Sequence, residues 1–210
     1  MRIGILSDTH APGGLDDLGP ELGAFLSSVD RILHTGDVDQ SRVFDWLEQF
    51  APVICCRGNH DWFDDDRMPD VVMFDAEGWT IGAKHQMELP TDTLESVLKI
   101  KRDSFGGAAV DILIDGDTHF ERVEYLHSTL FLNSGSATLP HNYGPRLGGV
   151  ALLEISEDRV HAELIRLGET PGLRNPSRTG HVTIGRNGIL DAAFDGAPAA
   201  YLPHEVRWPE

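Results

Sequence analysis

Five short apolar segments in this chain end abruptly in residues that can bind a metal ion. The clearest is residues 53–56, which lead into Gly58-Asn59-His60-Asp61 and so place an amide, an imidazole and a carboxylate on successive positions. An apolar run that stops at polar residues is typical of a buried strand that delivers a loop to the edge of a sheet. The other four segments end in the same way: residues 2–6 before Asp8 and His10, 31–33 before Asp37, 79–82 before His85, and 110–114 before Asp117 and His119. Because ligands of open α/β sheets bind outside the carboxyl ends of the strands, the five ends predict one shared site.

The first sixty residues alternate between strand-like and helix-like patterns. Residues 2–7, 31–34 and 53–57 have the apolar character of strands. The intervening helices are marked by Leu18, Leu22, Phe25 and Leu26, and then by Val43, Leu47 and Phe50, with Asp39 as the predicted N-cap of the second. This βαβαβ order predicts a parallel sheet covered by helices.

Hairpins replace that alternation from about residue 71. Paired strand-like runs occur at 71–74 with 79–83, 122–127 with 129–133, and 148–156 with 159–167, and a single run covers 110–114. Asp92 and Glu95 form a capping-box pattern at the start of a third helix. An α/β fold with two mixed sheets in a sandwich and flanking helices accommodates both halves.

The last forty residues have a different texture. Residues 168–180 are rich in Gly, Pro, Arg and Ser and are predicted to be a linker. Beyond them, Asn187-Gly188 between two strand-like runs indicates a hairpin. A lone hairpin is marginal unless it packs on something, so a docked hairpin and a loose tail both stay open. We therefore predict a main domain at 1–167 and a C-terminal extension at 168–210.

Charge and composition narrow the class of protein. A formal net charge of −17 disfavours the broad phosphate contacts of duplex nucleic-acid binding. It does not exclude a small phosphorylated substrate, because bound metals can dominate the local field. Cys55 and Cys56 are predicted to be buried thiols of a reducing compartment. Since no signal peptide or membrane-spanning stretch is apparent, we expect a cytoplasmic protein without membrane contact, of open oligomeric state.

The strand-end residues divide into two predicted ligand groups. The first is Asp8, His10, Asp37 and His119; the second is Asp37, Asn59, His85 and Asp117, with Asp37 shared. Mixed carboxylate, amide and imidazole ligands suit Mn²⁺, Fe or Zn²⁺. Two cations about 3.5–4 Å apart can hold a hydroxide and clamp the oxygens of a phosphoryl group during displacement.

Each of these residues also has a structural explanation. Asp8 and Asp37 could cap helices, Asn59 could be a turn residue, and His85 could be an ordinary surface histidine. Metal binding is favoured because all of them fall at strand ends, and for Asp117 both a metal-binding and a structural role stay open.

The order of the motifs along the chain resembles that of the calcineurin-like metallophosphoesterase superfamily. The motifs are Asp-x-His, Gly-Asp, Gly-Asn-His-Asp, a lone His and Gly-x-x-His. The chain is similar to its small bacterial and archaeal phosphodiesterase branch, near which the retromer subunit of the same fold also belongs. The resemblance covers about residues 1–167. It implies a four-layer α/β/β/α sandwich, a dinuclear site that often holds manganese, and His60 as the general acid. Asn133-Ser134-Gly135-Ser136 resembles a late family loop, with Ser134 in place of proline.

Two positions depart from the family pattern. Asp117 stands where the family usually has histidine, and Gln86 where it usually has glycine. If Asp117 binds, three carboxylates leave about +1 rather than +2 on two divalent cations before the hydroxide is counted, which favours Mn²⁺ or Mg²⁺ over Zn²⁺. If the Asp117 side chain, which is shorter than imidazole, does not reach, the second metal is labile. We therefore expect two metals, with the second held loosely.

These observations together predict a metal-dependent phosphoesterase that acts on phosphodiesters. A hydroxide that bridges the metals attacks phosphorus, and His60, oriented by Asp61 or Asp39, protonates the leaving oxygen. His141 and Arg146 are candidates for binding the substrate phosphate. The alternatives are a phosphomonoesterase and a catalytically weak metal-binding scaffold of the same fold.

Overall fold

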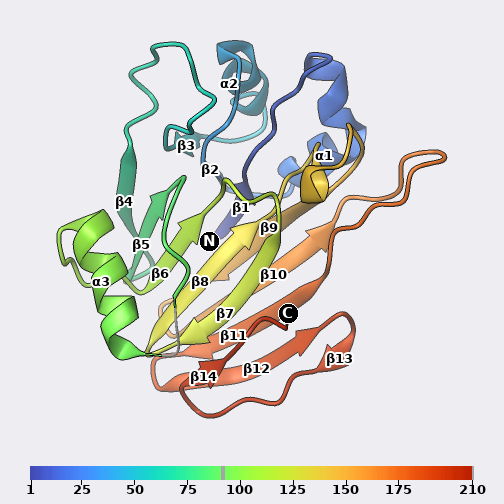
Figure 1. The fold of residues 1–210 in the computed structure, drawn as a ribbon. Helices are drawn as coiled ribbons and strands as arrows, with labels where there is room; N and C mark the ends of the chain where they lie inside the picture. The colour runs from blue at the N-terminus through green and yellow to red at the C-terminus, as the bar shows by residue number, and fades with distance from the viewer. Residues whose placement is uncertain (91–92, 210) are drawn as a thin grey trace.

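Two β-sheets packed face to face form the body of the protein (Figure 1). The computed structural model describes residues 1–90 and 93–209. Within them the larger sheet has eight strands, in the spatial order β13-β12-β11-β10-β9-β1-β2-β3. Their bounds are β1 Arg2–Leu6, β2 Arg31–His34, β3 Val53–Cys55, β9 Gly149–Ile155, β10 Arg159–Arg166, β11 Gly180–Gly185, β12 Gly188–Phe194 and β13 Ala197–Pro198.

The smaller sheet has six described strands, in the order β14-β7-β8-β6-β5-β4. Their bounds are β4 Val71–Ala76, β5 Trp79–Lys84, β6 Ile112–Asp115, β7 Glu121–Leu126, β8 Thr129–Ser134 and β14 Glu205–Val206. Both sheets are mixed. The central strands β1, β2 and β3 are parallel in one sheet, and β5, β6 and β8 are parallel in the other, while the hairpins add antiparallel pairs.

Alternation along the strands explains why the sheets pack on each other. Ile3 and Ile5 of β1 lie in the same buried cluster as Ile112 and Ile114 of β6, and all four are fully buried. Successive side chains of a strand point to opposite faces of the sheet, so the residues between these isoleucines face outward, where helices pack on them. Burial of the apolar side chains in this cluster supplies most of the free energy that holds the two sheets together.

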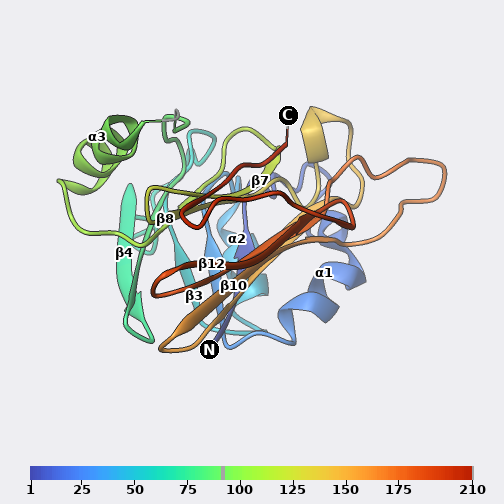
Figure 2. The same cartoon turned by 90° about the horizontal axis from the view of Figure 1, so that it is seen from below.

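Helices cover the two outer faces. The helices α1 (Gly19–Leu26) and α2 (Ser41–Leu47) pack on the larger sheet, and α3 (Leu94–Phe105) packs on the smaller one. In both views α3 lies on the opposite side of the molecule from α1 (Figures 1 and 2). Two mixed sheets with flanking helices confirm the predicted fold class. Short 3₁₀ turns occupy Leu15–Leu18 and Pro140–Asn142.

The predicted helix caps need correction. Gln40 is the N-cap of α2, and Asp39 is not, because Asp39 has a left-handed backbone (φ 62°) and its carboxylate bonds to a histidine instead. Thr93 caps α3 by accepting a hydrogen bond from the backbone N–H of Ser96. The Asp92 of the predicted capping box lies outside the described residues.

The C-terminal hairpin is docked. Strand β11 pairs antiparallel with β10 along Gly180–Gly185, and β12 pairs with β11, so the hairpin extends the larger sheet. The loose-tail alternative is therefore wrong for this segment. Among the described residues, no helix is both long enough and apolar enough to cross a membrane.

Candidate metal centre

The carboxyl ends of β1, β2 and β3 in one sheet and of β5 and β6 in the other bring the predicted ligands together. Several of them have positive φ, which is uncommon for residues with a side chain: Asp8 51°, Asp37 59°, Asp117 68° and His119 61°. Such conformations persist where the surrounding structure holds them, and they cluster at functional sites. The strand ends thus turn sharply and present their side chains to one place.

Asp61 and Gly58 hold two of these turns together. The buried carboxylate of Asp61 accepts hydrogen bonds from the backbone N–H groups of Asp37, Val38, Asp39 and Gly58, at 2.8–3.0 Å. A Cβ atom at Gly58 would collide with the backbone nitrogen and carboxylate of Asp37. Only glycine therefore lets the two loops pack this closely.

The first predicted ligand group is assembled in the structure. The Nε2 atoms of His10 and His119 lie 3.2 Å apart, and the carboxylate of Asp8 lies 3.6 Å from His119 Nε2. The Oδ2 atom of Asp37 lies 3.5 Å from His10 Nε2. Asp8, His10 and His119 form a group whose ligand atoms all lie within 4.8 Å of one another.

The second group lies on the other side of Asp37. The Oδ1 atom of Asp37 is 3.4 Å from His85 Nε2, so the two oxygens of the Asp37 carboxylate face the two ligand groups. His85 Nε2 is also 2.7 Å from Asn59 Oδ1 and 3.6 Å from Asp117 Oδ1. All seven predicted ligands therefore meet in one region, with Asp37 between the groups.

The donor set fits divalent cations. The Nδ1–H of His85 donates to the Thr35 carbonyl at 2.7 Å, and the Nδ1–H of His119 donates to the Leu139 carbonyl at 2.9 Å. These bonds fix each ring so that Nε2 faces the carboxylates, which is how metal-binding histidines are commonly oriented. Histidine Nε2 atoms crowded against carboxylate oxygens are an arrangement that a cation would stabilise.

His60 is exposed at the rim of this region. Its ring lies 5.2 Å from the ring of His10, centroid to centroid, and its backbone N–H donates to Asp37 Oδ1 at 2.8 Å. His60, His10 and Asp39 have ligand atoms within 4.8 Å of one another. Asp39 is thus the carboxylate beside His60. Asp61 is not, because its carboxylate is occupied by backbone N–H groups.

The two departures from the family pattern contact each other. The Gln86 side-chain amide donates to Asp117 Oδ1 at 2.8 Å. This bond occupies the oxygen that lies nearest His85 and holds the Asp117 side chain, which is 37% exposed, at the edge of the second group.

Several residues that support the ligand loops could not be identified from the sequence, because their contacts join distant parts of the chain. Ser136 Oγ donates to the Asp8 carbonyl at 2.6 Å, and Thr138 Oγ1 donates to the Thr9 carbonyl at 2.6 Å. These hydroxyls tie the loop after β8 to the loop after β1. The resemblance of residues 133–136 to a family loop was the one sequence signal that pointed here.

His141 and Arg146 lie in the loop after β8 and have protein partners. His141 Nε2–H donates to the buried Glu121 carboxylate at 2.7 Å, and its ring stacks on Phe120 with centroids 4.4 Å apart. The Arg146 guanidinium donates to the carbonyls of Gly144 and Arg174. A role for His141 and Arg146 in substrate binding stays a prediction.

Burial and charge shift the titration of two candidate ligands. Burial raises the pKa of the Asp8 carboxyl to about 7, although the nearby charge of His85 opposes the shift. Burial lowers the pKa of His85, but its hydrogen bond to Asp37 and the charges of Asp8 and Asp37 outweigh burial and raise it to about 9. Without a cation, His85 therefore carries a proton at neutral pH and Asp8 is about half protonated.

We expect metal affinity to rise with pH between about 6 and 9. A protonated carboxyl or imidazolium must lose its proton before it can bind a cation, so acid competes with the metal at Asp8 and His85. Calorimetry of Mn²⁺ binding in buffers of different ionisation enthalpy should show release of up to about two protons at pH 7. A pH-independent affinity would contradict this assignment.

Comparison with known proteins agrees with the geometry. A model of the calcineurin-like phosphoesterase superfamily domain matches residues 1–158. A probable metallophosphoesterase of Methanothermobacter thermautotrophicus is 30% identical over 168 residues, which are 80% of this chain and 94% of that protein. Another, from Methanocaldococcus jannaschii, is 30% identical over 170 residues, covering 80% and 83% of the two chains. The fold also matches Vacuolar Protein Sorting 29 from Cryptosporidium parvum, with a TM-score of 0.69 at 23% identity over 88% of this chain and 98% of that one. The chain belongs to the calcineurin-like phosphoesterase superfamily.

Proposed function

We propose that the protein is a phosphodiesterase with two divalent metal ions. The observation that carries the proposal is the position of Asp37, whose two carboxylate oxygens face separate ligand groups at 3.5 Å and 3.4 Å. A shared carboxylate of this kind suits a pair of cations a few ångströms apart. Mn²⁺ is the expected metal, with Fe, Zn²⁺ or Mg²⁺ as alternatives.

The residues of this chain divide the work. Bound divalent cations supply the charge that activates water and stabilises the phosphoryl oxygens. Asp8, Asp37 and the two ring-oriented histidines, His85 and His119, would hold these cations and so fix where the phosphoryl group sits. His60, exposed beside this region and close to Asp39, gives its proton to the leaving alcohol oxygen, so that the alcohol departs neutral.

Charge favours a diester over a monoester. Three carboxylates offset most of the charge of two divalent cations and leave about +1 before a hydroxide is counted. Among the described residues, no Lys or Arg side chain pairs with Asp8, Asp37 or Asp117. A monoanionic diester therefore matches the site better than a dianionic monoester does.

A substrate panel tests the function directly. The purified protein, stripped of metal and reloaded with Mn²⁺, Mg²⁺ or Zn²⁺, should hydrolyse bis(p-nitrophenyl) phosphate faster than p-nitrophenyl phosphate. Asp37→Ala, which removes the shared carboxylate, should abolish both activities. Faster hydrolysis of the monoester would favour a phosphomonoesterase. No turnover with any metal would instead favour a metal-binding scaffold.

Asp117→His should tighten the second metal. In the wild-type protein the second group relies on a partly exposed carboxylate that also accepts a hydrogen bond from Gln86. A histidine there should raise the affinity of the weaker site by about tenfold or more, as changes around metal ligands commonly do. Metal content after gel filtration should rise from about one to about two ions per chain.

Asp117→Asn is the matched control, since it keeps the shape of the side chain and removes its charge. This variant should bind the second metal more weakly than the wild type. Two tightly held ions in the wild-type protein would overturn the idea of a loose second site.

A further inference from the structure

The side chain of Trp62 stands in solvent beside the candidate general acid. It is 87% exposed, the highest value among the large hydrophobic side chains in the described part of the chain. Its ring lies 6.5 Å from the ring of His60, at an interplanar angle of 81°. The ring of His60 in turn lies 5.2 Å from that of His10. Trp62 therefore lies on the same side of the site as His60.

The backbone around Trp62 is held on both sides. The Arg57 guanidinium donates to the carbonyls of Asp61 at 3.1 Å and Phe63 at 2.8 Å. The Trp62 N–H donates to the His60 carbonyl at 3.1 Å, and the buried Asp61 carboxylate anchors the preceding turn. Several hydrogen bonds thus hold the backbone of this loop, while the indole ring of Trp62 stays exposed. An exposed aromatic ring on a backbone that is already held can bind another planar ring without ordering the loop first.

The charges near Trp62 limit how much negative charge a ligand bound there can carry. Asp64 and Asp66 are exposed on the same loop, while Asp65 pairs with Arg67 at 2.6 Å. Together with the formal charge of −17, these carboxylates repel a polyanion. A ligand with one phosphate and one planar ring avoids that repulsion, whereas a nucleic-acid strand does not.

We propose that Trp62 stacks on the base of a nucleoside that forms the leaving group of a small phosphodiester. This inference rests on the proposed phosphodiesterase activity and names its substrate class. In the reaction a water oxygen bonds to phosphorus as one of the water protons passes to solvent, and the bond from phosphorus to the nucleoside oxygen breaks. The proton of the His60 imidazolium goes to that oxygen, so the products are a nucleoside and a phosphomonoester.

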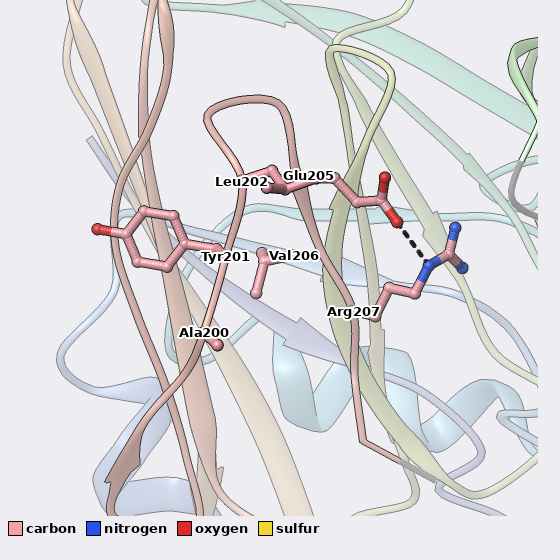
Figure 3. Close-up of a pocket in the computed structure, with 6 residues that line it drawn as sticks. All are labelled: Ala200, Tyr201, Leu202, Glu205, Val206 and Arg207. Carbon is pink, nitrogen blue, oxygen red and sulfur yellow. Dashed lines mark hydrogen bonds and ion pairs between the residues drawn. The ribbon is translucent and has the colours of Figure 1, made fainter.

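The pocket drawn in Figure 3 does not compete as a nucleoside site. It has a volume of about 360 Å³ and is lined by Ala200, Tyr201, Leu202, Glu205, Val206 and Arg207. None of these is a candidate ligand or follows a strand end of the metal centre. Tyr201, 42% exposed in that pocket, offers a control for the loss of an exposed aromatic ring.

Two substrates that share one phosphoryl group separate stacking from phosphate binding. Adenosine 5′-methyl phosphate presents a base, and glycerol methyl phosphate does not. Trp62→Ala should raise KM for the adenosine diester by about tenfold to a hundredfold, because stacking of a base on an aromatic side chain is lost. KM for the glycerol diester should stay unchanged. Trp62→Phe should restore most of the difference, and Tyr201→Ala should behave as the wild type.

Binding measurements keep the test independent of turnover. With Mn²⁺ present, calorimetry should show tighter binding of adenosine 5′-monophosphate than of glycerol 3-phosphate, and Trp62→Ala should remove that difference. If the wild type hydrolyses neither diester yet shows this Trp62-dependent binding, the proposed activity fails and the stacking role stands. Equal losses on both ligands, or no loss on either, would overturn the role of Trp62.

Discussion

Replacing His60 by glutamine is expected to lower kcat on an alkyl or nucleoside phosphodiester by about 10²- to 10⁴-fold, the usual contribution of a positioned general acid. Glutamine keeps a polar side chain of similar reach but has no ionisable proton to give. His60 is exposed and is not needed to complete either ligand group, so metal content should stay the same. The free energy of unfolding should change by no more than about 0.5 kcal/mol, as for other surface substitutions.

The leaving group provides an internal control for His60. A p-nitrophenolate departs readily without a proton, whereas an alkoxide does not, so His60→Gln should slow a p-nitrophenyl diester much less than an alkyl diester. His204→Gln removes an exposed histidine from the C-terminal segment and should have no effect on either substrate. Equal slowing of both substrates would assign His60 to phosphate binding instead of proton transfer.

The strand ends were predictable because the signal for them is local. An apolar run that stops at Asp37 or Asn59 indicates a buried strand and its edge without reference to any other part of the chain. A sheet edge then collects several such ends, so residues as far apart as Asp8 and His119 could be expected to meet. The family motifs agreed with the grouping of the ligands that the strand ends had suggested, and they added the role of His60.

Asp39 shows where local signals fail. An aspartate just before a helix is a common N-cap, yet here the Asp39 N–H is held by the Asp61 carboxylate and its own carboxylate bonds to His10. Both partners are more than twenty residues away. The same holds for His85, whose Nδ1–H donates to the carbonyl of Thr35, the residue that follows β2 of the other sheet. Contacts of this kind depend on how the two sheets pack, which no sequence window contains.

Deleting residues 168–210 is expected to destabilise the whole protein, although the family model ends at residue 158. Val182, Ile184 and Val206 are buried in the core between the sheets and would be lost. Burying a side chain of this size contributes about 1.5–3 kcal/mol, so the three account for roughly 5–9 kcal/mol. A domain is stable by only about 5–15 kcal/mol in total. The deletion also strips the edge of β10 and exposes Leu164.

The truncated chain should therefore be largely insoluble, or should melt at least about 10 °C below the full chain when followed by circular dichroism. Point variants distinguish the loss of buried side chains from other effects of removing the whole segment. Ile184→Ala, at a buried position of β11, should cost about 2–5 kcal/mol, whereas Leu190→Ala, at a 58% exposed position of β12, should change stability by no more than about 0.5 kcal/mol. If the truncated chain melts with the full one and keeps its metals, residues 1–167 fold without the hairpin. In that case the burial of Val182 and Ile184 stabilises only the extension, and the larger sheet does not depend on its last strands.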